Sequence, residues 1–142
     1  MLYIFIGSKN DKLFLNAGIK YLEKNNVLYK IIITSVHRQP ITAHHLILKT
    51  LKNKNIKIII GGAATATGLP GVIAGYIYQK KLDIKVLSLR FTKKPWPRFL
   101  AFMEKFLFRL SGMPSGPELK YTGYNEYGFL KACKIAKEII EK

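Results

Sequence analysis

The sequence predicts a three-layer α/β/α sandwich, in which helices cover both faces of a parallel β-sheet. Short runs rich in β-branched residues recur about every 25 to 30 residues, and the stretches between them carry apolar residues at helical spacing. Alternation of strands and helices is typical of parallel sheets. The runs are apolar throughout rather than at every second position, as expected for strands that are buried on both faces.

Five strands are expected, the last with the weakest pattern, at residues 2–6, 28–34, 56–60, 84–89 and 119–122. After the first strand, helical spacing places several apolar residues on one face, namely Leu13, Leu15, Gly18, Ile19 and Leu22. The same spacing recurs further on, at Phe99, Phe102, Met103, Phe106 and Leu110. A final helix is expected at about 125–141, and the residues that it should turn inward are Ala132, Ile135, Ala136 and Ile139.

The length and composition fit one domain. The chain has 142 residues, of which 49% are hydrophobic, so a single domain over residues 1–142 is expected. The one cysteine, Cys133, excludes an internal disulfide framework and a cysteine-rich zinc module, and it favours a reducing, cytoplasmic location. The beginning, MLYIFIGSKND, lacks the basic region and the long apolar run of a secretory signal.

The chain is strongly basic, with 24 Lys and Arg against 8 Asp and Glu and a formal charge of +16. This excess favours an anionic ligand or partner. Compositional drift in an AT-rich genome would produce the same lysine-rich mixture without any nucleic-acid partner. Because no aromatic RNA-binding motif accompanies the charge, nucleic acid is not expected as a partner.

One segment of the sequence has to be considered as a candidate membrane span. Residues 58–78 carry no charge and are long enough to cross a bilayer. However, the β-branched run IKIII is followed by GGAATATGLPG, which holds four glycines and a proline. This pattern indicates a buried strand and a loop, so no membrane span is expected.

Loops at the carboxyl ends of the strands are where an open parallel sheet binds its ligands. They also lead into helix N-termini, whose backbone N–H groups bind anions. The loops that meet this description are residues 7–11, 34–40, 61–71, 90–97 and 112–116.

The first of these loops carries hydroxyl and carboxylate groups. In GSKND, Ser8 and the N–H groups after it are suited to a phosphate. Asp11 is suited either to cap the next helix or to accept hydrogen bonds from ribose hydroxyls, and its residue type alone favours the cap. Either Lys9 or Lys12 could add positive charge there.

The second loop, TSVHRQP, combines three useful side chains. Arg38 offers a planar fork that suits a phosphate, and His37 is the natural proton donor and acceptor near neutral pH. Pro40 suits the first turn of a following helix. The alternative is a capped helix with a surface salt bridge. His44 and His45 fall inside that helix and are expected to be solvated or packing residues.

The remaining loops carry weaker signals. The small residues of 61–71 leave space for a ligand or for another subunit, but they form neither a GxxxxGK[ST] nor a GxGxxG motif. The aromatic and basic stretch that begins PWPR and continues FLAFMEKFLFRL is expected to be core or subunit interface. A membrane surface is the alternative for this stretch.

Four motifs together resemble the carboxyaminoimidazole ribonucleotide mutase (PurE) family, in order over nearly the whole chain. GSKND, SVHRQP, the glycine-rich loop ending in GLPG, and SGMPSG are similar to that family's GSxSD, SAHRTP, AGxxxAAHLPG and QMPxGxP. The resemblance implies a flavodoxin-like sandwich that assembles as a homo-octamer. It also implies an isomerase of purine biosynthesis, which moves a carboxylate from the exocyclic nitrogen of a ribonucleotide to a ring carbon without metal or cofactor.

The resemblance also implies roles for individual residues. His37 would be the general acid and base. The residues that the resemblance places against the substrate are Ser8, Asp11, Ser35, Arg38, Gly62, Ala63, Met113 and Pro114. The two serines and the arginine would hold the phosphate and the aspartate the ribose, while the glycine and alanine would wall a cavity for carbon dioxide. The methionine and proline would close over the base.

The chain departs from the family pattern at several positions. Val36 stands where the family has alanine, and Gly68 stands where it has histidine, a side chain expected near the transferred carboxylate. The family's PVxxxxxxGLDSLLS pattern is absent from residues 90–111. Two alternatives therefore stay open: direct carboxylation of aminoimidazole ribonucleotide by carbon dioxide, which is a lyase reaction, or a ribonucleotide-binding relative without this activity.

Overall fold

The computed structural model describes residues 1–64, 68–92 and 119–142. Within them, five parallel strands form one sheet in the order β2-β1-β3-β4-β5. The strands are β1 (Leu2–Ile6), β2 (Tyr29–Ile33), β3 (Ile58–Ala63), β4 (Lys85–Arg90) and β5 (Leu119–Tyr124). This is the strand order of flavodoxin-like sheets.

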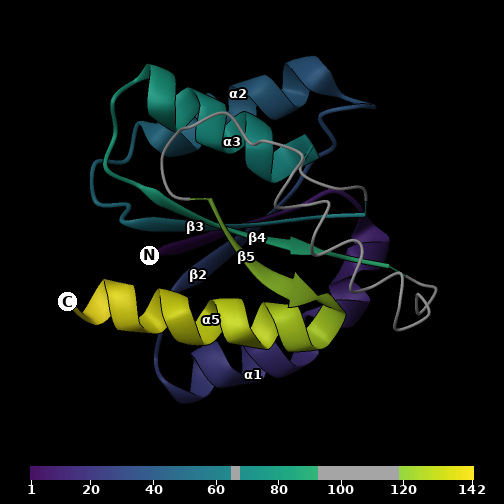
Figure 1. The fold of residues 1–142 in the computed structure, drawn as a ribbon, viewed down its shortest axis with the longest axis vertical. Coiled ribbons are helices and arrows are strands. Elements are labelled where there is room, and N and C mark those ends of the chain that lie inside the picture. Colours follow the sequence, from purple (N-terminus) through teal and green to yellow (C-terminus); the bar gives the residue numbers. More distant parts are fainter. Residues whose placement is uncertain (65–67, 93–118) are drawn as a thin grey trace.

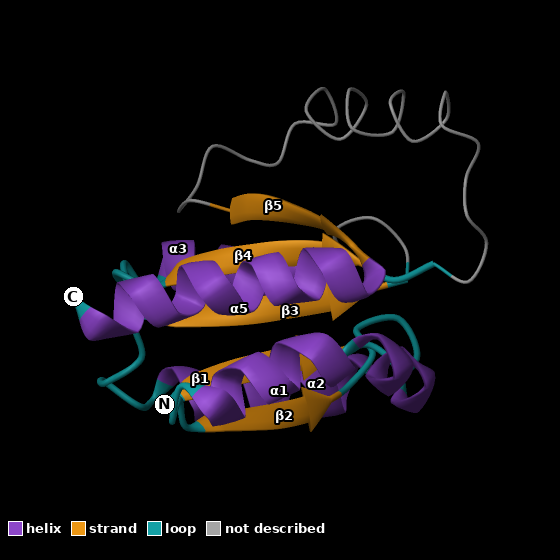
Figure 2. Cartoon of the chain, turned by 90° about the horizontal axis from the view of Figure 1, so that it is seen from below, coloured by secondary structure: helices purple, strands orange, loops and turns teal. Residues whose placement is uncertain are grey.

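Helices cover both faces of the sheet (Figure 1). On one face lie α2 (Pro40–Leu51) and α3 (Gly68–Gln79), and on the other lie α1 (Asn16–Lys24) and α5 (Asn125–Glu141). Figure 2 shows α1 and α5 lying along the strands on one side of the sheet. The expected three-layer α/β/α sandwich is confirmed. The aromatic stretch at 99–110 and the loop at 112–116 lie outside the described residues, as does most of the loop at 90–97.

Each face of the sheet has its own apolar core. Beneath α1 and α5, Leu22 and Phe129 are fully buried against the strands, and beneath α2 and α3, Ile47 and Ile73 are fully buried. The inward residues expected for the last helix are confirmed as Ala132 and Ala136, both fully buried, with Ile135 and Ile139 partly buried beside them.

Helices α1 and α5 approach each other closely at Gly18. A Cβ atom added there would lie 2.3 Å from the ring of Phe129 and 2.9 Å from Cys133 Sγ, so only glycine fits. Burial raises the pKa of the Cys133 thiol to about 12, which keeps this cysteine neutral and packed.

The expectation that Leu13 faces inward is wrong, because its side chain is 74% exposed. Leu13 belongs to a 3₁₀ helix (Lys9–Phe14) that precedes α1 and breaks the helical period.

The third strand extends further than its pattern predicted. Gly61 and Gly62 were expected in a loop, but both lie in β3 and pair with β1 and β4. Neighbouring side chains take up the space that these glycines leave, since added Cβ atoms would lie 3.0 Å from Pro70 and 2.3 Å from Phe91. The loop after β3 is therefore shorter than residues 61–71.

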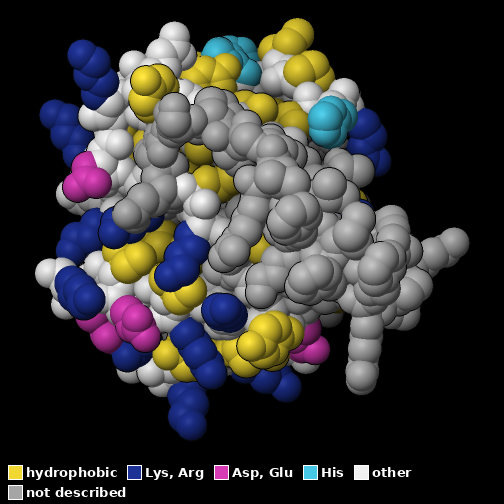
Figure 3. Space-filling model, viewed as in Figure 1, with side chains coloured by type: hydrophobic (Ala, Val, Ile, Leu, Met, Phe, Trp, Pro, Cys, Tyr) yellow, Lys and Arg dark blue, Asp and Glu magenta, His cyan; other side chains and the backbone are white. Residues whose placement is uncertain are grey.

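The uncharged segment at 58–78 divides into strand β3 and helix α3. Among the described residues, no helix is long and apolar enough to span a membrane. On the face seen in Figure 3, lysine and arginine side chains lie among apolar and acidic ones, mostly in the lower and left parts of the view.

Candidate functional site

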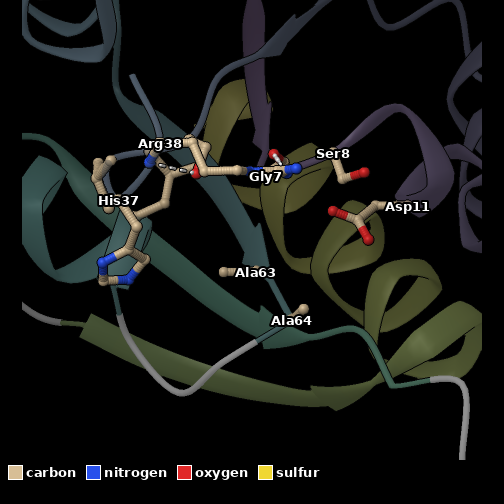
Figure 4. A pocket seen from close by; sticks show the side chains of 10 residues that line it. Gly7, Ser8, Asp11, His37, Arg38, Ala63 and Ala64 are labelled. Atoms are coloured by element: carbon tan, nitrogen blue, oxygen red, sulfur yellow. Dashed lines mark hydrogen bonds between the residues drawn. The ribbon is translucent and has the colours of Figure 1, made fainter. Parts of the chain in front are cut away.

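Three loops meet at the carboxyl edge of the sheet, because β1 lies between β2 and β3. Ile6, the last residue of β1, pairs with Ile33 on one side and Gly62 on the other, so the three strands end at the same level. The loops enclose a cavity of about 200 Å³ (Figure 4). Its lining residues are Gly7, Ser8, Asp11, Ser35, Val36, His37, Arg38, Ala63, Ala64 and Leu69.

The β1 loop turns immediately into the 3₁₀ helix. Ser8 is its N-cap, and its Oγ accepts a hydrogen bond of 3.2 Å from the Asn10 N–H. Asp11 follows in the first turn, 6% exposed and lining the cavity. The expectation that Asp11 caps the helix is therefore wrong. The hydroxyl of Ser8 satisfies the backbone, and the carboxylate of Asp11 faces the cavity instead.

The β2 loop forms a tight turn that presents His37 and Arg38. Ser35 Oγ accepts a hydrogen bond of 3.3 Å from the Arg38 N–H, and the Ser35 carbonyl accepts one of 2.9 Å from the Gln39 N–H. Helix α2 then begins at Pro40, as expected from the sequence. Because an oxygen that accepts from a backbone N–H keeps its own hydrogen, the Ser35 hydroxyl can still donate to a ligand.

Arg38 reaches back from the β2 loop to the β1 loop. Its Nη2 lies 3.5 Å from the carbonyl oxygen of Gly7. Figure 4 shows the guanidinium extended toward Gly7 and Ser8, with His37 and Asp11 on opposite sides of the cavity. Among the described residues, the arginine side chain donates to a carbonyl rather than to a carboxylate, so its positive charge is available to an anion.

The wall formed by β3 and α3 is apolar. Ala63, Ala64 and Leu69 line the cavity here, and the Ala64 carbonyl accepts a hydrogen bond of 3.2 Å from Arg90 Nε. Gly62 does not line either cavity described here, because it lies one residue deeper, against the ring of Phe91. Of the two small residues expected to wall the site, Ala63 lines the first cavity and Gly62 lines neither, and their contact with a ligand stays a prediction.

A second cavity of about 480 Å³ adjoins the first and shares Gly7, Ser8, Ser35 and Arg38 with it. The residues found only in the second cavity are Lys9, Asn10, Ile33, Thr34 and Gln39. Of the two lysines considered from the sequence, Lys9 lines this cavity, whereas Lys12 lines neither. The shared residues, with Lys9, place positive charge and two hydroxyls where the cavities join.

Sequence reasoning missed the apolar side chains of Val36 and Leu69, which line the first cavity. In the sequence, only their positions suggested a place in the site, since Val36 precedes His37 and Leu69 lies in the segment GLPG.

Met113 and Pro114 lie outside the described residues. Within ranges 1–64, 68–92 and 119–142, no group of three His, Cys, Asp or Glu side chains is placed to hold a metal ion. The cofactor-free site stays a prediction.

The chain resembles known proteins most clearly over the residues that build this site. The sequence model of the AIR carboxylase family matches residues 1–85, which include all three loops. The "Probable N5-carboxyaminoimidazole ribonucleotide mutase" of Methanobrevibacter smithii is 36% identical over 90 residues, which are 61% of this chain and 26% of that protein. The "N5-carboxyaminoimidazole ribonucleotide mutase" of Vibrio vulnificus is 29% identical over 140 residues, 96% of this chain and 78% of that one.

A solved structure agrees on the fold. The crystal structure of Treponema denticola PurE superposes with a TM-score of 0.65 and covers 99% of this chain and 86% of its own, at 19% sequence identity. At that identity the likeness concerns the fold alone.

Proposed function

The chain belongs to the AIR carboxylase (PurE) family, and from this premise we propose that it is an N5-carboxyaminoimidazole ribonucleotide mutase of purine biosynthesis. The reaction is an isomerisation in which a carboxylate moves from the exocyclic nitrogen to a ring carbon. The chain spans only 26% of the length of the Methanobrevibacter relative and 78% of the Vibrio relative. The activity is therefore a proposal, and the residues around the cavity support it.

The observation that carries the proposal is the meeting of five side chains around one cavity. Ser8 and Asp11 follow β1, while Ser35, His37 and Arg38 follow β2. Together they offer hydroxyl donors, one cation, one carboxylate and one imidazole around about 200 Å³. These groups suit a phosphorylated sugar with an attached heterocycle.

The phosphate would bind where the two cavities join. Ser8, Ser35 and Arg38 line both cavities, and Lys9 lies beside them in the larger one. A guanidinium binds a phosphate through two parallel N–H donors, and the serine hydroxyls add single donors. Asp11, buried in the smaller cavity, would accept hydrogen bonds from the ribose hydroxyls.

His37 would move the protons of the reaction. As the bond between the exocyclic nitrogen and the carboxylate breaks, the nitrogen must receive a proton, and carbon dioxide leaves. The ring carbon then attacks the carbon dioxide, and its proton must be removed to restore the aromatic ring. One imidazole can give the first proton and take the second, so the reaction ends with the catalyst in its starting state.

The apolar wall would hold the carbon dioxide between the two steps. The side chains of Ala63, Ala64 and Leu69 form no hydrogen bonds, so water molecules beside them would form few. Holding the small molecule beside the nucleophilic carbon keeps its effective concentration high. We propose further that Met113 and Pro114 close over the base.

We also propose a single domain over residues 1–142 that assembles as a cytoplasmic homo-octamer. Residues from both ends of the chain pack in the same core, where Leu2 and Phe129 are fully buried, which supports the single domain. The family resemblance supports the octamer, and the lone buried Cys133 is in keeping with a reducing compartment.

A two-substrate assay tests the proposed function. The purified chain is supplied with N5-carboxyaminoimidazole ribonucleotide, and separately with aminoimidazole ribonucleotide and bicarbonate, each against a reaction without protein. Faster formation of the carbon-carboxylated product from the first substrate is expected. Faster reaction of the second would favour the carboxylase alternative. Reaction of neither above background would contradict the proposal.

A further inference from the structure

We propose that Gly68 is a positioning residue for His37, because the missing side chain makes the space in which the imidazole lies. The inference rests on the proposed function, for which His37 is the acid and base. Nothing in the family pattern assigns such a role to position 68, where the family has histidine. This chain therefore has a histidine at position 37 but none at position 68, whereas the family pattern has both.

The ring of His37 occupies the space that a side chain at position 68 would need. A Cβ atom added to Gly68 would lie 2.7 Å from His37 Nε2 and 3.5 Å from Cε1 of the same ring. A carbon atom and a nitrogen atom at the first of these distances would overlap, so the His37 ring cannot keep its present place beside a larger residue at position 68. Gly68 begins α3, directly before Leu69 of the cavity wall.

The backbone gives no other reason for glycine at this position. Gly123 has a φ of +122°, which requires glycine, whereas Gly68 has no such left-handed φ. The feature that a side chain at position 68 would meet first is the ring of His37.

A second departure from the family pattern lies at the same place. Val36, which stands where the family has alanine, has its Cγ2 3.5 Å from the position of a Cβ at residue 68. The larger residue at 36 and the smaller one at 68 are therefore neighbours across the cavity wall. A side chain at position 68 would thus meet both Val36 and the imidazole of His37.

The substitution Gly68→Ala tests the inference, with Gly75→Ala as a matched control. Gly75 lies in the same helix, and an added Cβ there would have no neighbour within 4 Å. The Gly68→Ala chain should keep its melting temperature, because the atom that must move is the far end of the exposed His37 side chain. The kcat of the mutase reaction should fall about 10- to 100-fold, as expected for a misplaced catalytic group.

Two readouts distinguish positioning from a general structural effect. The KM should stay within about threefold of the parent value, since the phosphate-binding side chains are untouched. In a His37→Asn background, Gly68→Ala should lower kcat no further, because the group that it displaces is already absent. Gly75→Ala should leave kcat and KM unchanged in both backgrounds.

A nuclear magnetic resonance measurement decides the matter even if the chain lacks mutase activity. The ring nitrogen signals of His37, identified by their loss in His37→Asn, should shift in Gly68→Ala and stay in place in Gly75→Ala. Failure of the parent chain in the two-substrate assay would contradict the proposed function but leave this readout intact. Unshifted His37 signals in Gly68→Ala, or a kcat equal to that of Gly75→Ala in an active parent, would overturn the inference.

Discussion

Replacing His37 with asparagine should lower the kcat of the mutase by about 10²- to 10⁴-fold, the contribution typical of a positioned general acid and base. Asparagine keeps a polar side chain that can hydrogen-bond, but it cannot take up and release a proton near neutral pH. The KM should change little, because Ser8, Ser35 and Arg38 would still hold the phosphate.

The control for this variant is His45→Asn. His45 is exposed on α2 and lines neither described cavity, so the substitution removes an imidazole of similar exposure and leaves the site intact. Its kcat and KM should match those of the parent. A His37→Asn chain with more than about a tenth of the parent kcat would mean that another group moves the protons.

Removing the guanidinium of Arg38 is the second large effect expected. An arginine that binds a phosphate through charged hydrogen bonds contributes about 2 to 4 kcal/mol when its partner is desolvated. Arg38→Ala should therefore lower kcat/KM by about 30- to 1,000-fold, mainly through a higher KM. The position supports this, since Arg38 lines both cavities and spans the gap to the β1 loop.

Arg38→Lys separates charge from geometry. Lysine keeps the positive charge but loses the planar pair of donors, so its kcat/KM should lie between those of the parent and Arg38→Ala. Lys52→Ala removes an exposed cation at the end of α2, away from both cavities, and should leave the kinetics unchanged. An Arg38→Ala chain with an unaltered KM would place the phosphate elsewhere.

The layers of the fold could be predicted from the sequence because strands buried on both faces are apolar throughout, a pattern that is easily recognised. The five apolar runs were expected within a few residues of their observed positions, and β1 agreed at both ends. The pattern failed where local geometry departs from a regular helix or loop. Leu13 is exposed because a 3₁₀ helix precedes α1, and Gly62 lies in β3 rather than in the following loop.

The candidate site could be predicted only in part, for a physical reason. Which loops meet depends on the order of the strands, and chain spacing alone does not determine that order. The residue type favours Asp11 as the helix cap, yet Ser8 is the N-cap, and sequence alone does not separate them because serine and aspartate both cap helices well. The contact of Gly68 with His37 joins two loops distant in the sequence, and no local pattern signals it.

The most direct test of carboxylate transfer at this site follows the carbon itself. N5-carboxyaminoimidazole ribonucleotide carrying ¹³C in its carboxylate is converted in a buffer that contains excess unlabelled bicarbonate. If the carbon dioxide stays against the apolar wall formed by Ala63, Ala64 and Leu69, the label is retained in the carbon-carboxylated product. Unlabelled product, with the ¹³C recovered as bicarbonate, would contradict a transfer held within the cavity.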